Sequence, residues 1–400
     1  MKPVRGLAGL NLALGMLVAM PAVAKEGDTF RPFVSYARYY DSNLFRLSDS
    51  EIDAASKVFA KTTDQFGVLS AGLKMDLELG RQNILASAAL SQTRYSHYNS
   101  QDNDGYDYQL RWNWKVGNHW SGDVGATDSQ AQSSYSDVSV SLVPNEVTRA
   151  HRFASANWLF HPRWQIGLNA DQSDVSNSAP LQRISDYDDR GMGATLTYLT
   201  PKGSRASGQL RRVDADYPNR VLGVIDNSYS QTEYNLLGDW RSTGKLTARG
   251  RVGYVQRDYP NVSERSYAGF NGRISADYVP TGKAVLNLAV FRELGNSDDT
   301  NATYSLNTGA SLGAAWLATT KITLRASASF ENRDYQGDPG VVLVGDTRNE
   351  DELKGSFSIS YVPLRMASID LGWQAGSRDS NISDEEYSYH LFFASVRAEF

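Results

Sequence analysis

The stretch Gly105–Trp120, GYDYQLRWNWKVGNHW, decides the fold. Within Tyr106–Trp114 every second residue is aromatic or leucine, whereas the residues between them are charged or carry amides. A period of two is typical of a β-strand with one apolar and one polar face. Gly117–His119 then carries the signal of a tight turn, and Trp120 opens the next segment. The stretch therefore predicts a strand, a short turn and a returning strand.

The same alternation recurs along the chain, for example over 268–278, 322–331 and 352–361. A single strand of a soluble sandwich would show this pattern too. Many such segments at even spacing are typical of a membrane barrel with a lipid-facing surface and a polar lumen. No segment after the N-terminus resembles a membrane-spanning helix, so a spanning structure has to be a closed barrel.

Tight-turn signals set the period of the pattern, at intervals of about 37 to 45 residues, the length of one hairpin with its outer loop. They lie at 80–82, 117–119, 161–163, 200–203, 242–244, 280–282, 319–321 and 363–365. Aromatic residues flank these turns, which predicts a girdle at one membrane interface. They are Trp114, Trp120, Phe160, Trp164, Tyr198, Trp240, Tyr278, Trp316 and Tyr361.

Longer polar stretches separate the hairpins, at 41–62, 98–104, 131–146, 174–185, 217–225, 258–263, 295–302, 334–349 and 377–384. Eight short turns and nine long loops join 18 strands, so the fold class is all-β: a transmembrane antiparallel up-and-down barrel of about 18 strands. Sixteen strands is the alternative, if the first loop hides a poorer assignment. Phe400 ends an alternating apolar segment, as in the C-terminal strands of outer-membrane barrels.

The N-terminus predicts a signal peptide over residues 1–24. Lys2 and Arg5 supply its positive region, 7–20 its apolar region, and 22–24, Ala-Val-Ala, its cleavage site. The apolar region is shorter than the ~20 residues of a spanning helix. Secretion and the barrel pattern together predict the bacterial outer membrane.

Residues 25–400 are expected to form the barrel alone, with the first strand beginning near Phe30 and no room for a plug or passenger domain. The chain has no cysteine, which excludes disulfides and a lipid-bearing cysteine. Its five histidines are scattered, and it has no metalloprotease, serine-hydrolase or nucleotide-binding motif. We expect no enzyme activity, no cofactor, no metal and no nucleic-acid partner.

The alternation assigns side chains to the two faces. Outward, to lipid, should point Leu69, Leu73, Trp112, Leu236, Phe270, Leu324, Phe357 and Ile369. Inward should point Gln109, Arg111, Glu233, Arg251, Arg273, Arg325 and Asp370. Acidic and basic residues nearly balance over the whole predicted lumen, so many of them are expected to form ion pairs.

A basic patch stands out in the predicted lumen: Arg249, Arg251, Arg257, Arg273 and Arg325. Four of these residues form the predicted substrate path: Arg249, Arg251, Arg273 and Arg325, on the strands numbered 11, 12 and 15. One interpretation is a substrate path, because guanidinium groups can guide an anionic solute through a pore. The alternative is that Asp239, Asp277 and Glu331 neutralise the arginines inside the barrel.

Two stretches carry a family resemblance. Residues 31–36, RPFVSY, and 40–47, YDSNLFRL, resemble the start of EpsL-type outer-membrane proteins of exopolysaccharide operons. Arg-Asp-Tyr at 257–259 and 333–335, with a partial copy at 216–217, is similar too. The resemblance implies a role in secretion or assembly of an extracellular polysaccharide and supplies no catalytic residues.

Two classes of function follow from these observations. The resemblance favours a channel, or an accessory barrel, for polysaccharide export. Its partners would be outer-membrane lipids, lipopolysaccharide, an anionic polysaccharide and periplasmic export components. The architecture alone suggests the alternative, a general or solute-specific diffusion porin. An acidic loop folded into the lumen would favour the porin, but loop 131–146 has only Asp137 and Glu146 as acidic residues.

Overall fold

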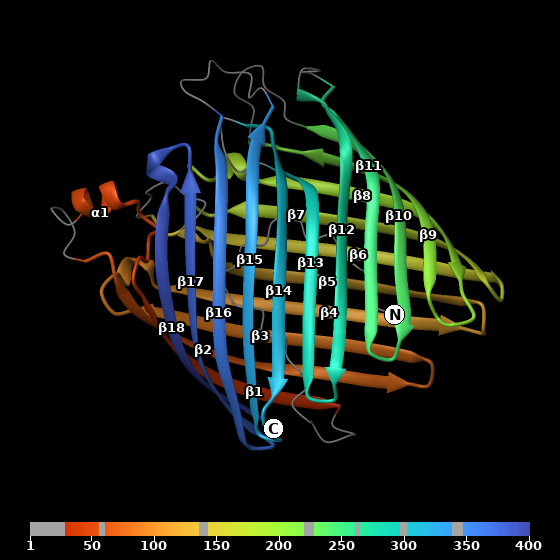
Figure 1. The fold of residues 1–400 in the computed structure, drawn as a ribbon, viewed down its shortest axis with the longest axis horizontal. Coiled ribbons are helices and arrows are strands. Elements are labelled where there is room, and N and C mark those ends of the chain that lie inside the picture. The colour runs from red at the N-terminus through yellow and green to blue at the C-terminus, as the bar shows by residue number, and fades with distance from the viewer. Residues whose placement is uncertain are drawn as a thin grey trace.

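The computed structural model describes residues 29–55, 61–135, 143–219, 228–260, 265–296, 302–337 and 347–400. They form one closed antiparallel barrel of 18 strands, each paired with its neighbours in chain order (Figure 1). The ring closes between the first strand and the last, where Phe33 lies opposite Glu399. The prediction of 18 strands is confirmed, and the alternative of 16 is wrong.

The strands are long, as a tilted membrane crossing requires. Their bounds are β1 Phe30–Asp41, β2 Asp64–Leu79, β3 Gln82–Tyr95, β4 Asn103–Val116, β5 Trp120–Gln132, β6 Glu146–His161, β7 Trp164–Asn177, β8 Tyr187–Leu199, β9 Arg205–Asp216, β10 Tyr229–Thr243, β11 Leu246–Asp258, β12 Tyr267–Thr281, β13 Ala284–Asn296, β14 Tyr304–Leu317, β15 Ile322–Gln336, β16 Asn349–Leu364, β17 Ala367–Ser380 and β18 Tyr387–Glu399. The helical elements are α1 Asp49–Ala55 and short 3₁₀ turns at Asn99–Gln101, Arg183–Ser185 and Ser383–Glu385.

The eight predicted turns all join consecutive strands at one end of the barrel, and the nine predicted loops lie at the other end. The helix α1 belongs to the first loop (Figure 1). No helix within the described ranges has the length and hydrophobicity of a membrane span. The predicted signal peptide, residues 1–24, lies outside the described residues.

Large apolar side chains gather on the outer face of the barrel. Leu236 and Phe270 leave 72% and 70% of their surface exposed, which lipid would cover in a membrane. Seven of the eight predicted outward residues are exposed in this way. The eighth, Leu324, is half-buried and alternates with the same outer face as exposed Phe330. All nine residues of the predicted aromatic girdle share the outer face. The face assignments are therefore confirmed.

Candidate functional site

The lumen is open over its middle and turn-side parts. Gln109 of β4, Asn287 of β13 and Ser327 of β15 alternate with lipid-facing residues, so they point inward, and yet they are exposed. Side chains therefore do not fill the barrel at these heights. A ring of 18 strands is wide enough for an aqueous channel unless loops fold into it.

The centre of the predicted basic patch is an arginine pair that shares one carboxylate. Arg251 of β11 lies directly opposite Arg273 of β12. Arg251 Nη2 lies 2.6 Å from Glu293 Oε1, and Arg273 Nη2 lies 2.6 Å from Glu293 Oε2. Two positive charges face one negative charge, so this part of the wall keeps an excess of positive charge. Glu293 of β13 was missed from the sequence, although its alternation with Arg292 and Leu294 marks it as lumen-facing.

The other two predicted arginines lie apart from this pair. Arg249 is neutralised by Asp277, with Nη1 and Oδ2 2.7 Å apart. Asp239 and Glu331 bond to arginines outside the patch. Of the three acidic residues expected to neutralise the patch, only Asp277 forms an ion pair with one of its arginines among the described contacts. Arg325 lies three strands further round the wall on β15, and its buried Nε has no hydrogen-bond partner within the described residues. The four arginines line a wall and do not converge on a point.

An aromatic ring seated on a glycine supports Arg273. The guanidinium carbon of Arg273 lies 4.3 Å from the ring centre of Phe291 on β13, within the range of a cation–π contact. The Phe291 ring in turn lies against Gly309 of β14, where an added Cβ would be 2.7 Å from the ring. The glycine therefore lets the ring and the guanidinium lie along the wall instead of projecting across the lumen.

We expect Gly309→Ala to lower the free energy of unfolding by about 1–3 kcal/mol, because the new methyl group overlaps the Phe291 ring and a backbone oxygen. Gly313→Ala is the matched control on the same strand and face, since its Cβ meets only Asn287 at an ordinary 3.8 Å. Urea titration of the lipid-reconstituted barrel measures both. Equal destabilisation by the two variants would contradict the close contact between the Phe291 ring and Gly309.

The neighbouring wall has the opposite charge. On β9, Arg211 lies between Asp171 of β7 and Glu233 of β10, with N–O distances of 2.6 and 3.8 Å. Asp189 of β8, which the sequence analysis missed, lies on the same inner face. Three carboxylates therefore surround one guanidinium on β7–β10, beside the positive excess of β11–β13. A solute in the lumen meets the two signs on adjacent parts of the wall.

Lumen-facing charges near the loops of β15–β17 form a closed cluster. Glu350 is 1% exposed and forms ion pairs with Arg333, Arg348 and Arg378, and Arg378 is itself 1% exposed. The Arg378 Nη1–Glu350 Oε1 distance is 3.3 Å. The sequence placed Arg333 and Arg378 among the lumen bases, and they do point inward. Their burial makes them structural ion partners and removes them from the solute path.

The start of the loop after β1 is tied to β18 by a hydrogen-bonded knot at the loop end of the barrel. Arg46 makes a forked pair with Asp41, both N–O distances being 2.9 Å, and stacks 3.7 Å above the ring of Tyr389 on β18. Arg46 has φ 57°, a left-handed conformation that costs energy in a non-glycine residue. Asn43 closes the knot by exchanging two hydrogen bonds with the backbone of Leu47. These contacts fix residues 41–47 against β18 at the loop end of the lumen.

The β13–β14 hairpin narrows the lumen at its loop end. β12 and β13 pair only as far as Gly272 and Arg292, and beyond that point they diverge (Figure 1). Leu294 and Leu306, on the outer face of the hairpin, pack in one buried cluster with Val255 from the inner face of β11. The hairpin end therefore leans inward over β11 and β12. Among the described residues, the segments that lie at the loop end of the lumen are this hairpin end and the start of the first loop. An acidic loop folded into the lumen is not among them.

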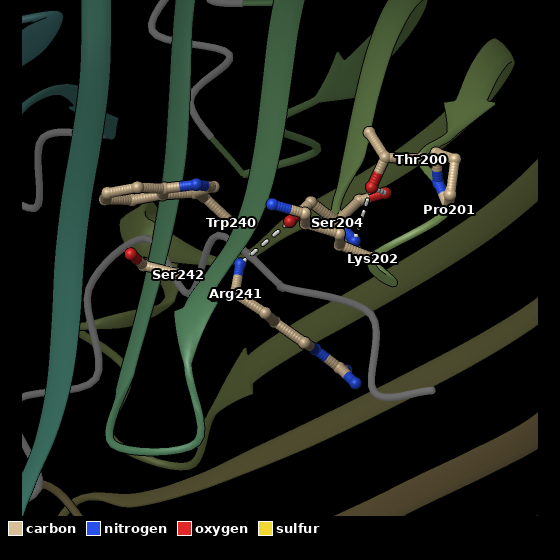
Figure 2. Close-up of a pocket in the computed structure, with 7 residues that line it drawn as sticks. All are labelled: Thr200, Pro201, Lys202, Ser204, Trp240, Arg241 and Ser242. Carbon is tan, nitrogen blue, oxygen red and sulfur yellow. Dashed lines mark hydrogen bonds between the residues drawn. The ribbon is translucent and has the colours of Figure 1, made fainter.

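Loop 131–146 does not make an acidic constriction in the described residues. Glu146 begins β6 and accepts from Gln130 at 2.7 Å, and Asp137 lies outside the described residues. Apart from the lumen, a hollow of about 460 Å³ lies at the turn end, lined by Thr200, Pro201, Lys202, Ser204, Trp240, Arg241 and Ser242 (Figure 2). It lies at the outer rim beside the girdle, so it does not belong to the lumen path.

Comparisons with known proteins agree with a channel. Residues 239–400 match the family described as "Putative beta-barrel porin 2". No curated protein matches the chain. The described residues contain no cluster of histidine and carboxylate side chains that could hold a metal ion. Together with the apolar outer face and the closed ring of strands, the family match settles the location. The protein lies in the bacterial outer membrane.

Several solved porins from Pseudomonas align with most of the chain at low identity and low TM-score. OpdK of Pseudomonas aeruginosa, crystallised with vanillate, is 12% identical, with 93% of this chain and 99% of that chain covered and a TM-score of 0.47. A BenF-like porin from Pseudomonas fluorescens Pf-5 is 11% identical, with 94% and 99% covered and a TM-score of 0.48. OccK2 (OpdF) of P. aeruginosa is 11% identical, with 93% and 98% covered and a TM-score of 0.48.

The resemblance to EpsL-type proteins is wrong, because the family that matches is a porin family. The predicted role in polysaccharide export is therefore not supported, and neither are the predicted polysaccharide and export partners. The quoted residues have a local structural reason. Residues 40–47 contain the knot of the first loop. In both Arg-Asp-Tyr stretches the arginine and the tyrosine are buried near the loop end of a strand, at 257–259 and 333–335.

Proposed function

We propose that the protein is a diffusion porin for small polar solutes, with an arginine-lined wall that favours anions. The observation that carries the proposal is the exposure of inward-facing polar side chains such as Gln109 and Asn287 in a closed 18-strand barrel. Water-accessible polar walls allow hydrated solutes to pass without a specific binding pocket. The match of residues 239–400 to a porin family supports the same function. We infer a passive role with no catalytic step.

Only some arginines of the predicted substrate path contribute to this proposal. Arg251 and Arg273 carry the charge excess, because they share Glu293, and Arg325 adds a second positive group further round the wall. Arg249 contributes little because Asp277 neutralises it. The acidic groups of β7–β10 keep the total charge of the lumen low. We therefore expect weak anion preference and no strict exclusion of cations.

Planar-bilayer recording of the full chain tests the proposal. Wild type should form water-filled channels whose reversal potential in a salt gradient shows a modest preference for anions. The double variant Arg251→Gln/Arg273→Gln should shift this preference toward cations, because Glu293 then stands without a positive partner.

Arg292→Gln is the matched control, since Arg292 is the neighbour of Glu293 on β13 and points to the outer face. It should leave the reversal potential unchanged. A barrel that inserts but conducts no ions would overturn the porin proposal. Channels whose selectivity is the same in both variants would overturn the role of the arginine pair.

A further inference from the structure

The outer face carries few positive charges, and three of them gather on four neighbouring strands. Arg152 of β6, Arg190 of β8 and Arg212 of β9 lie on the same face as the lipid-facing residues of their strands and are exposed. Gln172 of β7 pairs with both Arg152 and Arg190, so these side chains form one cross-strand row. Arg212 of β9 lies opposite Met192, which is two residues from Arg190 on β8. We call this set the arginine row.

The arginine row lies at one height above the aromatic girdle. Arg152 is eight positions from Phe160 on β6, and Arg190 is eight positions from Tyr198 on β8. Arg212 pairs with Thr232, which places it at an equivalent height over the girdle residue of β10. Eight residues of a tilted strand rise by roughly 20 Å, close to the ~25 Å of the apolar band. The arginine row therefore marks the outer boundary of the hydrocarbon layer, on the side of the long loops.

The surface below the row is apolar and the groups above it are acidic. Exposed large apolar side chains on β7–β10 cover the band: Leu168, Met192, Leu196, Leu210, Tyr234 and Leu236. Above the row, Asp174 lies 3.7 Å from Arg152, and Asp214 lies 3.2 Å from Arg212. Arg152 and Arg212 remain 64% and 59% exposed at the side chain. The carboxylates hold the guanidinium groups at the boundary from the outer side and leave them open toward lipid.

We propose that the arginine row binds the phosphorylated glucosamine headgroup of one lipid A molecule of lipopolysaccharide, with its acyl chains lying on β7–β10. The chemistry fits because guanidinium groups bind phosphates in forked, charge-assisted pairs. The height fits because lipid A phosphates lie at the hydrocarbon boundary of the outer leaflet. The neighbouring carboxylates, Asp174, Asp188 and Asp216, form a row of directly paired like charges, which is unfavourable unless cations are near. Binding should therefore be stronger in the presence of Mg²⁺.

The other outward arginines are engaged by protein side chains. Arg38 of β1 and Arg94 of β3 both pair with Gly67 of β2, but Arg38 donates to Gln65 and Ser96, and Arg94 forms ion pairs with Asp102 and Asp104 and is 45% exposed. Arg292 of β13 lies apart from them and donates to Thr308. Lipopolysaccharide contacts the whole outer rim of a barrel in this membrane. The arginine row assigns a specific site within that rim, and the assignment is independent of what crosses the lumen.

Native mass spectrometry of the full, lipopolysaccharide-free barrel in detergent tests the assignment. Hexa-acylated lipid A should bind with a stoichiometry of one, more tightly with Mg²⁺. The triple variant Arg152→Gln/Arg190→Gln/Arg212→Gln should weaken this binding at least about tenfold, the effect of losing one strong charge-assisted contact. The control triple Arg38→Gln/Arg94→Gln/Arg292→Gln removes the same charge and should retain the binding.

Two further ligands identify the group that is recognised. Dephosphorylated lipid A should bind the wild type as weakly as phosphorylated lipid A binds the first triple variant. Phosphatidylglycerol should not compete with lipid A. Equal losses in the two triple variants would overturn the site, and so would unchanged binding in the first. Competition by phosphatidylglycerol would show a general anionic-lipid surface and overturn the assignment to lipid A. Thermal unfolding of each variant without lipid shows whether the barrel still folds.

Discussion

Glu350→Gln should lower the free energy of unfolding by about 3–5 kcal/mol, the cost of removing one charged partner from a buried ion-pair cluster. Glu350 is almost fully buried and forms ion pairs with Arg333, Arg348 and Arg378. Neutralising it leaves Arg348 and Arg378 to share Glu385, while Arg333 keeps Glu331 and Glu352. Equilibrium unfolding in urea, followed by tryptophan fluorescence in lipid vesicles, measures the change.

The adjacent residue supplies the control for this substitution. Asp351 points to the outer face of β16, is exposed, and accepts from Asn332 at 2.8 Å. Asp351→Asn should change the free energy of unfolding by less than about 1 kcal/mol, as for other exposed polar contacts. A loss for Glu350→Gln no larger than that for Asp351→Asn would show that the cluster does not stabilise the barrel.

Freeing the first loop should raise the single-channel conductance. In the double variant Asp41→Asn/Arg46→Gln the forked pair is lost, and with it the contact of Arg46 on Tyr389. Because Arg46 sits in a left-handed conformation, the backbone gains by relaxing once these contacts are gone. Residues 41–47 should then leave their position against β18, at the loop end of the lumen, for part of the time. Bilayer recordings should show larger and noisier open currents, with stability changed less than by Glu350→Gln.

A matched pair on the outer face separates this effect from the loss of an ion pair as such. Arg94 and Asp104 lie 3.0 Å apart on the lipid side of β3 and β4. Arg94→Gln/Asp104→Asn removes one positive and one negative charge, as the loop variant does, and should leave the conductance at the wild-type level. If both double variants conduct like the wild type, the knot does not restrict the entrance.

The strand count and the two faces were predictable because both follow from local chemistry. The alternation in Tyr106–Trp114 assigns each side chain to lipid or lumen, since a slip of one residue would reverse the whole strand. Turn residues such as Gly117, with φ 58°, fix where each strand ends. Repetition of these two signals along the chain is enough to count strands.

The functional detail was harder because it depends on contacts across strands. Glu293 alternates correctly, but its bonds to both Arg251 and Arg273 depend on how β11, β12 and β13 are aligned. The leaning hairpin reverses the local rule, since Leu294 keeps the outer-face pattern and is buried inside the barrel mouth. Short motifs misled the family assignment, because the rim uses them for packing.

The closure of the ring has a consequence for how the protein comes apart. β1 pairs with both β2 and β18, and the backbone nitrogen of Phe400 donates to the oxygen of Pro32 at 2.9 Å. A sheet without an edge offers no terminal strand that can fray away alone. Amide hydrogens in the middle of all 18 strands should therefore exchange at one common, slow rate, with β1 and β18 as protected as any other strand. The seam between β1 and β18 can form only after β18 has been synthesised, so cooperative unfolding and the late arrival of one strand are linked in this fold.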